Sequence, residues 1–143
     1  MFWPFVKKHS KSFPYKKEVN SWGRTFYRPL VITNIKHTDG SWHPYPMYID
    51  SGADITVINK SFGNLIGLKL RPNENKFEIR GLGGNLEAVY RDIVIRVVHK
   101  SIKIKISWVL SDDVPLLLGR ESVFNRFNIC FEEKQKKVTF KEN

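Results

Sequence analysis

The stretch MYIDSGADITVIN, residues 47–59, carries the strongest structural signal in the chain. It begins with apolar and aromatic residues and then passes through a Ser-Gly-Ala triplet, which is typical of a tight turn. Asp50 therefore stands where a strand leaves the core, and a second carboxylate, Asp54, follows shortly after it. A carboxylate in such a turn lies near backbone N–H groups and is both fixed and reachable. We interpret Asp50 as a candidate catalytic residue.

Strands are predicted on both sides of this stretch. Residues 28–50 (RPLVITNIKHTDGSWHPYPMYID) hold two strand-like runs around an Asp39-Gly40 turn, so the second run would deliver Asp50. Residues 75–98 (NKFEIRGLGGNLEAVYRDIVIRVV) hold two extended segments around a glycine-rich tip, which predicts a second hairpin. Residues 101–110 (SIKIKISWVL) alternate between apolar and polar side chains, which is the period of a half-buried strand.

The last part of the chain completes an all-β pattern. Residues 114–119 (VPLLLG) form a short apolar run suited to a buried strand, and residues 120–127 (RESVFNRF) have the composition of a two-turn helix. Residues 128–142 predict a hairpin with a charged tip, and a weaker helix signal lies near residues 60–66. The predicted fold class is an all-β domain, a closed or partly closed β-barrel with one short C-terminal helix.

Three features in order resemble one protein family. The segment IDSGADITVIN resembles the active-site motif of the retropepsin-like aspartic proteases. RGLGGN, residues 80–85, follows where that family has its flap hairpin. LLLGRES, residues 116–122, follows where the family has a strand and a helix beneath the active-site loop. The resemblance covers residues 29 to about 132 and implies a retropepsin-like barrel with a flap hairpin.

The resemblance implies a role for each residue of the motif. Asp50 would be the catalytic carboxylate, and Ser51 would lock two active-site loops together. Gly52 would offer its carbonyl group to the substrate. Ala53 would leave room for the substrate, and Asp54 would bind the substrate main chain. Alone, an Asp-Ser-Gly triplet also marks ordinary turns, and it resembles the start of a phosphorylation-dependent degradation signal, which belongs in a disordered segment.

The two later features have implied roles and simpler alternatives. Arg120 would pair with Asp54, with Gly119 supporting the loop, but Arg120 could also be an ordinary exposed residue. The glycine-rich tip would be the moving flap, although it could be a plain hairpin turn. It is a poor phosphate-binding loop, because no helix with the expected Lys or Ser/Thr follows. The residues of the implied flap tip are Gly81, Leu82, Gly83 and Gly84.

An aspartic protease needs two carboxylates about 3 Å apart that share one proton. This chain has one such motif, because residues 39–41 (Asp-Gly-Ser) reverse the Ser/Gly order and Asp112-Asp113 precede Val-Pro. The resemblance therefore implies a homodimer with Asp50 of each chain on the twofold axis, acting on polypeptide substrates without a cofactor. Viral members build their dimer from the extreme terminal strands, and here other segments occupy those ends.

Composition limits the alternatives. The chain has 143 residues, 41% hydrophobic and 13% aromatic, which is enough for one packed domain. Its single cysteine, Cys130, excludes an intrachain disulfide, and its four scattered histidines show no metal-ligand spacing, so we expect no metal. The sequence shows no signal peptide and no apolar run of about 20 residues, so we expect a soluble cytoplasmic protein without a membrane span.

Residues 1–28 form a basic, aromatic N-terminal arm ahead of the domain at residues 29–143. They carry seven Lys or Arg residues and one acid, Glu18, a net +6 out of the chain's +10. Basic and aromatic residues together could contact nucleic acid or an anionic surface. The simpler interpretation is a solvated arm that docks its aromatic side chains on the domain. We also hypothesise a substrate-recruiting extension or a self-cleavage segment.

Three functions are in competition at this point. The leading hypothesis is a homodimeric aspartic endopeptidase. The second is a catalytically silent retropepsin-like dimer that binds peptides or serves as a scaffold. The third is a basic nucleic-acid-binding β-barrel, which accounts for the charge but leaves Asp50, Asp54 and the Gly119-Arg120 pair unexplained.

Overall fold

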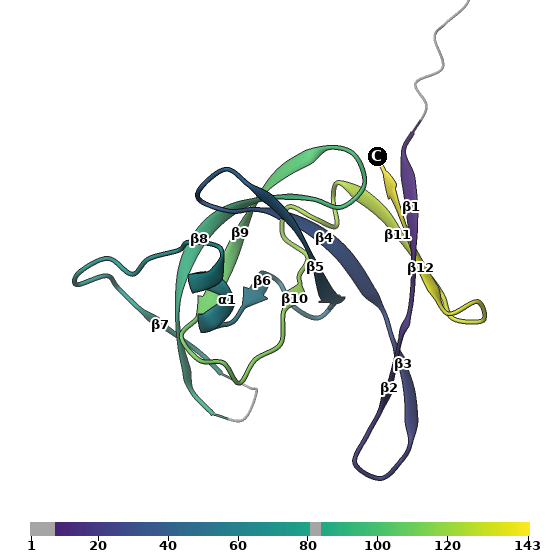
Figure 1. Ribbon diagram of the computed structural model, residues 1–143, viewed down its shortest axis with the longest axis horizontal. Coiled ribbons are helices and arrows are strands. Elements are labelled where there is room, and N and C mark those ends of the chain that lie inside the picture. The colour runs from purple at the N-terminus through teal and green to yellow at the C-terminus, as the bar shows by residue number, and fades with distance from the viewer. Residues whose placement is uncertain (1–7, 81–83) are drawn as a thin grey trace, which may run out of the picture.

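Six strands close into a barrel in the computed structural model, which describes residues 8–80 and 84–143. Within these residues the strands follow one another around the ring, and the pairing of the first with the last closes it, at Asn34 opposite Arg96 and Ile35 opposite Ile95 (Figure 1). The predicted closed barrel is confirmed. In ring order the strands are β4 (Leu30–Lys36), β5 (Trp42–Ile49), β10 (Leu117–Leu118), β6 (Thr56–Ile58), β9 (Ser101–Val109) and β8 (Leu86–Arg96).

The predicted hairpins are present. Strands β4 and β5 pair in antiparallel register around the Asp39-Gly40 turn, where the Asp39 carboxylate accepts a hydrogen bond from the Ser41 N–H at 2.8 Å. Gly40 has a φ of 90°, a conformation that glycine adopts at no steric cost. Strand β7 (Phe77–Ile79) pairs with the start of β8 and extends the sheet beyond the ring. The tip of that hairpin, residues 81–83, lies outside the described residues.

Strand β9 has the predicted alternation. Its isoleucines are buried, whereas Lys103 and Lys105 are exposed. Trp108, at the end of this strand, is 1% exposed and packs against the one helix of the described residues, α1 (Lys60–Leu65). Its Nε1 donates a hydrogen bond to the Lys60 carbonyl at 3.3 Å. A Cβ on Gly63 would stand 2.0 Å from that same Nε1, so the helix can approach the ring only with glycine there.

The helix predicted at residues 120–127 is wrong. The segment is a series of turns, in which the Phe124 and Val123 N–H groups both donate to the Arg120 carbonyl. Ser122 has a φ of 62°, in the left-handed region, and this residue interrupts the right-handed path that a helix needs. The weaker helix signal near residues 60–66 is the one that corresponds to a helix, α1, with Asn59 as its N-cap.

Residues 10–28 of the N-terminal segment form three strands. Strand β1 (Ser10–Pro14) pairs with β12 (Lys137–Glu142), which also pairs with β11 (Phe127–Glu132), so the predicted C-terminal hairpin gains a third strand. Phe13 and Tyr15 are buried, and the Phe13 ring meets Phe140 edge-on at 6.0 Å. The aromatic side chains of the arm thus dock on the domain at these two positions.

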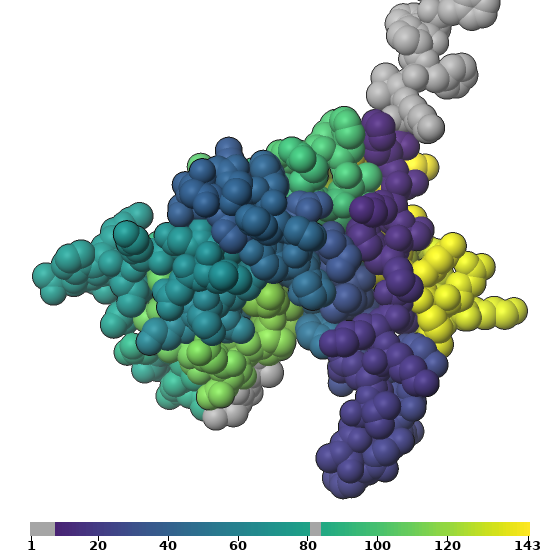
Figure 2. Space-filling view, in the orientation of Figure 1, coloured from purple at the N-terminus to yellow at the C-terminus, as the bar shows by residue number. Residues whose placement is uncertain are grey.

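A two-stranded ribbon follows β1. Strands β2 (Lys16–Val19) and β3 (Thr25–Arg28) pair only with each other among the described residues. The ribbon projects away from the barrel as a separate lobe (Figures 1 and 2). No helix of the described residues is long and apolar enough to cross a membrane.

Candidate active site

Asp50 follows β5 directly, and its backbone and side chain are both fixed. Its N–H donates to the Leu118 carbonyl at 3.0 Å, and its own carbonyl accepts from the Ala53 N–H at 3.2 Å, which closes the turn. The Gly52 N–H donates to the Asp50 carboxylate at 2.9 Å. The side chain is half-buried. The Ser-Gly-Ala triplet thus forms a tight turn that directs a backbone N–H at the carboxylate.

Strand β10 fixes the position of this turn. It runs between β5, to which it is parallel, and β6, to which it is antiparallel, with Leu117 opposite both Tyr48 and Val57. This arrangement ties the strand before Asp50 to the strand after it. The barrel therefore fixes both ends of the loop at residues 50–55, which is the requirement for a preorganised catalytic group.

Gly119 lies where β10 meets the end of the loop. A Cβ at this position would stand 2.6 Å from the carbonyl carbon of Ile55, so the two backbones can approach only with glycine. The Gly119 N–H donates to the buried Thr56 hydroxyl at 3.0 Å. The sequence identified Gly119 but not Thr56, because a threonine within a run of β-branched residues is typical of any strand.

The predicted ion pair between Asp54 and Arg120 is not formed in the described residues, so this prediction is wrong for the single chain. Both side chains are exposed, and nothing forces them to pair. The backbones are joined instead. The Arg120 N–H donates to the Ala53 carbonyl at 2.9 Å, and the Glu121 N–H donates to the Asp54 carbonyl at 2.8 Å. The Arg120 guanidinium lies 5.9 Å from the centre of the Phe124 ring.

The other motif residues are accessible from outside the chain. Ser51 and Gly52 are exposed and Ala53 is half-buried, so other molecules can reach all three. Gly84, at the base of the β7–β8 tip, is exposed and has a φ of 141°. The remaining predicted flap residues lie outside the described part of the chain; they are Gly81, Leu82 and Gly83.

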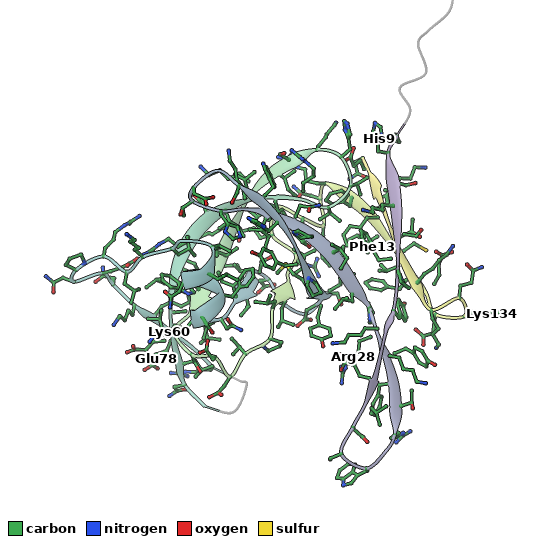
Figure 3. All side chains as sticks on the ribbon, viewed as in Figure 1. His9, Phe13, Arg28, Lys60, Glu78 and Lys134 are labelled. Atoms are coloured by element: carbon green, nitrogen blue, oxygen red, sulfur yellow. The ribbon has the colours of Figure 1, made fainter. Side chains whose placement is uncertain are left out.

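A hollow of about 370 Å³ opens beside Asp50. One wall comes from the barrel, including Tyr48, Ile49 and Leu117, and the other from the ribbon, through Glu18 and Arg28. Arg28 stands at the base of the ribbon, as Figure 3 shows. The N-terminal segment therefore contributes directly to the surroundings of the candidate catalytic residue.

Hydrogen bonds join the ribbon side of this hollow to its barrel side. The Tyr48 hydroxyl donates to one oxygen of Glu18, and the Arg28 Nε donates to the other oxygen at 3.1 Å. The hydrogen bond from Tyr48 lowers the pKa of Glu18 and raises the pKa of the Tyr48 hydroxyl. Sequence reasoning missed these residues. The one available signal was that Glu18 is the sole acid in a strongly basic segment.

The described residues hold no candidate metal centre. Among residues 8–80 and 84–143 no group of three or more His, Cys, Asp or Glu side chains could hold a metal ion.

Comparisons with known proteins bear on the fold. No protein-family model matches the sequence, and no curated protein matches it. A retropepsin-like aspartic protease from Rickettsia conorii superposes with a TM-score of 0.61 at 17% identity, covering 96% of this chain and 97% of that chain. EIAV protease complexed with the inhibitor HBY-793 aligns at 29% identity, covering 65% of this chain and 82% of that chain, with a TM-score of 0.48. The chain has the retropepsin-like fold, which confirms the predicted architecture.

Proposed function

We propose that this chain is an aspartic endopeptidase of the retropepsin-like family, active as a homodimer in which each chain supplies one Asp50. The observation that carries the proposal is the position of Asp50. Its carboxylate is held by the Gly52 N–H in a turn fixed at both ends by β10, on a retropepsin-like barrel. A carboxylate that served only to cap a turn would need neither the hollow beside it nor the strand beneath it.

The dimer follows from the chemistry. Two carboxylates about 3 Å apart do not both ionise, so one serves as base and the other as acid. The sequence holds one Asp-Ser-Gly motif, and the second carboxylate would come from another copy. Isolated chains would be inactive, and activity would depend on protein concentration.

The reaction needs a water molecule between the two carboxylates. The ionised Asp50 accepts a proton from this water while the water attacks the peptide carbonyl, and the protonated Asp50 of the other chain donates to the carbonyl oxygen. Collapse of the tetrahedral intermediate breaks the C–N bond, and the leaving amine takes the proton that Asp50 accepted from the water. A hydroxyl of the intermediate returns a proton to the carboxylate of the other chain, which restores the starting dyad. No covalent intermediate forms, and the rate should show a bell-shaped pH dependence.

The substrates would be extended polypeptide segments. The turn at residues 51–53, exposed at Ser51 and Gly52, offers backbone groups, and the β7–β8 hairpin would close over a bound peptide. Such a site favours unfolded segments, because a folded domain cannot present an extended strand to it.

The test compares three proteins on a library of unfolded peptides between about pH 4 and 7. Wild type should cleave, whereas Asp50→Asn should lose activity by about a thousandfold or more, because removing a general acid or base costs that much. Asp92→Asn is the matched control, since Asp92 is exposed and faces Lys103 at 3.8 Å on the barrel wall. Asp92→Asn should retain full activity. Cleavage by Asp50→Asn at the wild-type rate, or no cleavage by dimeric wild type, would refute the proposal.

A further inference from the structure

The ribbon β2–β3 has two strands and no third among the described residues. The Asn20 side chain accepts hydrogen bonds from the Trp22 and Arg24 N–H groups, at 3.0 and 2.9 Å, and so fixes the turn at its tip. Within the described residues no other strand pairs with either edge. An isolated two-stranded hairpin is marginally stable in water, so a ribbon held in one shape is suited to packing against a further surface.

The ribbon is also fixed in direction relative to Asp50. Glu18 accepts hydrogen bonds from Tyr48 and Arg28, and the Lys16 Nζ lies 3.8 Å from the same carboxylate. Tyr48 belongs to β5, two residues before Asp50. The base of the ribbon is thereby attached to the strand that delivers the candidate catalytic carboxylate.

One free edge of the ribbon faces the side on which Asp50 lies. The Arg24 carbonyl accepts from Asn20 across the hairpin, whereas the Pro29 carbonyl accepts from Ile49 of β5 at 3.3 Å. Because successive residues of a strand direct their backbone groups to opposite sides, Thr25 and Tyr27 point away from β2, as Pro29 does. The unpaired edge of β3 therefore continues on the side of β5 and of the turn that follows it.

The ribbon concentrates exposed apolar surface. The described residues include nine exposed large hydrophobic side chains, and four of them lie on this short element. Trp22 is 89% exposed, Val19 63%, Tyr27 44% and Phe26 37%. Phe26 and Tyr27 are consecutive, so these side chains lie on both faces of the ribbon. Their concentration on one short element indicates an interaction surface.

The charge of the ribbon limits the kind of partner. Residues 16–28 carry four basic residues and one acid, a net charge of +3. Two exposed acidic residues belong to the surroundings of Asp50. Asp54 lies in the same loop, and Glu121 is joined to it because the Glu121 N–H donates to the Asp54 carbonyl at 2.8 Å. Together with Asp50 they outnumber the neighbouring Arg120, so the basic ribbon of one chain is complementary in charge to this loop in another copy.

We propose that the β2–β3 ribbon grips a second copy of this chain, packing its β3 edge and its exposed aromatic side chains near the partner's Asp50 turn. The inference rests on the proposed function, which requires two copies to meet at Asp50. The C-terminal strand cannot serve instead, because β12 already has β1 on one edge and β11 on the other. The ribbon is the element that is both unpaired and attached beside the site.

The test measures the dimer dissociation constant of the full chain by sedimentation. Trp22→Ser combined with Phe26→Ser removes the apolar contact, and Thr25→Pro removes an edge N–H that does not face β2. Each change should raise the dissociation constant about tenfold or more, the loss typical of a central interface residue. The control, Leu65→Ser with Leu70→Ser, removes side chains 61% and 43% exposed on α1 and the loop after it, and should leave the constant unchanged. Circular dichroism confirms that each variant folds.

The outcomes separate this inference from the proposed function. A wild type that stays monomeric, or ribbon variants that dimerise as wild type does, would overturn the inference. Ribbon variants that remain dimeric and cleave peptides would overturn it while the proposed function stands. A dimer weakened by the ribbon changes, from a wild type that cleaves no peptide, would support the ribbon and refute the protease.

Discussion

Thr56→Val should destabilise the protein, whereas the same change at Thr33 should not. Both threonines are fully buried. The Thr56 hydroxyl accepts the Gly119 N–H at 3.0 Å, so valine would leave that N–H buried without a partner, at a cost of about 1–3 kcal/mol. The Thr33 hydroxyl has no hydrogen-bond partner in the described residues, so valine there removes a polar group that folding has already desolvated. Its effect should lie between zero and about 1 kcal/mol of added stability.

Both variants replace a hydroxyl by a methyl group, so comparing their free energies of unfolding isolates the contribution of the hydrogen bond. A difference of about 2 kcal/mol corresponds to about 6 °C in Tm for a chain of this size. Thermal unfolding followed by circular dichroism and urea unfolding followed by tryptophan fluorescence would both measure it. Equal losses at the two positions, or a larger loss at Thr33, would refute the assignment of the Thr56 hydroxyl as the support of β10.

Two further predictions concern the barrel. Gly63→Ala should lower the free energy of unfolding by about 1–2 kcal/mol, because overpacking against the buried Trp108 ring outweighs the gain in helix propensity. An unchanged Tm together with unchanged tryptophan emission would contradict this prediction. Arg91 lowers the pKa of Glu74 to about 2 from an ordinary value of 4.5. The pair therefore stabilises the fold above pH 4.5 and loses that effect as the pH falls toward 2. Urea midpoints of wild type and Glu74→Gln should differ most near neutral pH and converge in acid, whereas the exposed Glu87→Gln should track wild type throughout; a constant difference would contradict this.

Local patterns in the sequence were sufficient for most of the barrel. Three of these patterns depend only on neighbouring residues: the Asp39-Gly40 turn, the alternation along residues 101–110 and the apolar run before Asp50. The structure has the predicted turn at the first and the predicted strand at the other two. The helix at residues 120–127 failed for a local reason as well. Ser122 adopts a left-handed conformation that its residue type does not predict, because serine occurs in both helices and turns.

Long-range pairings were the part that the sequence did not reveal. Strand β1 pairs with β12 at the opposite end of the chain, and Glu18 meets Tyr48 across the base of the ribbon. No periodicity within residues 1–28 indicates these contacts, since the strands are short and both faces carry charges. The segment looked like a solvated arm because its composition is basic, whereas residues 10–28 are placed by partners elsewhere in the chain.

The candidate site depends on the same long-range order. Leu118 and Gly119 reach Asp50 and Thr56 from β10, far along the chain, and a Cβ at Gly119 would separate the two backbones. The turn at Asp50 can form locally, but its position relative to the strand that follows it is set only when β10 enters between β5 and β6. Contacts so distant in sequence carry a loop-closure entropy cost that packing must offset. We therefore expect a partly folded chain to hold the motif without the site, because among the described strands only β10 joins the strand before the turn to the strand after it.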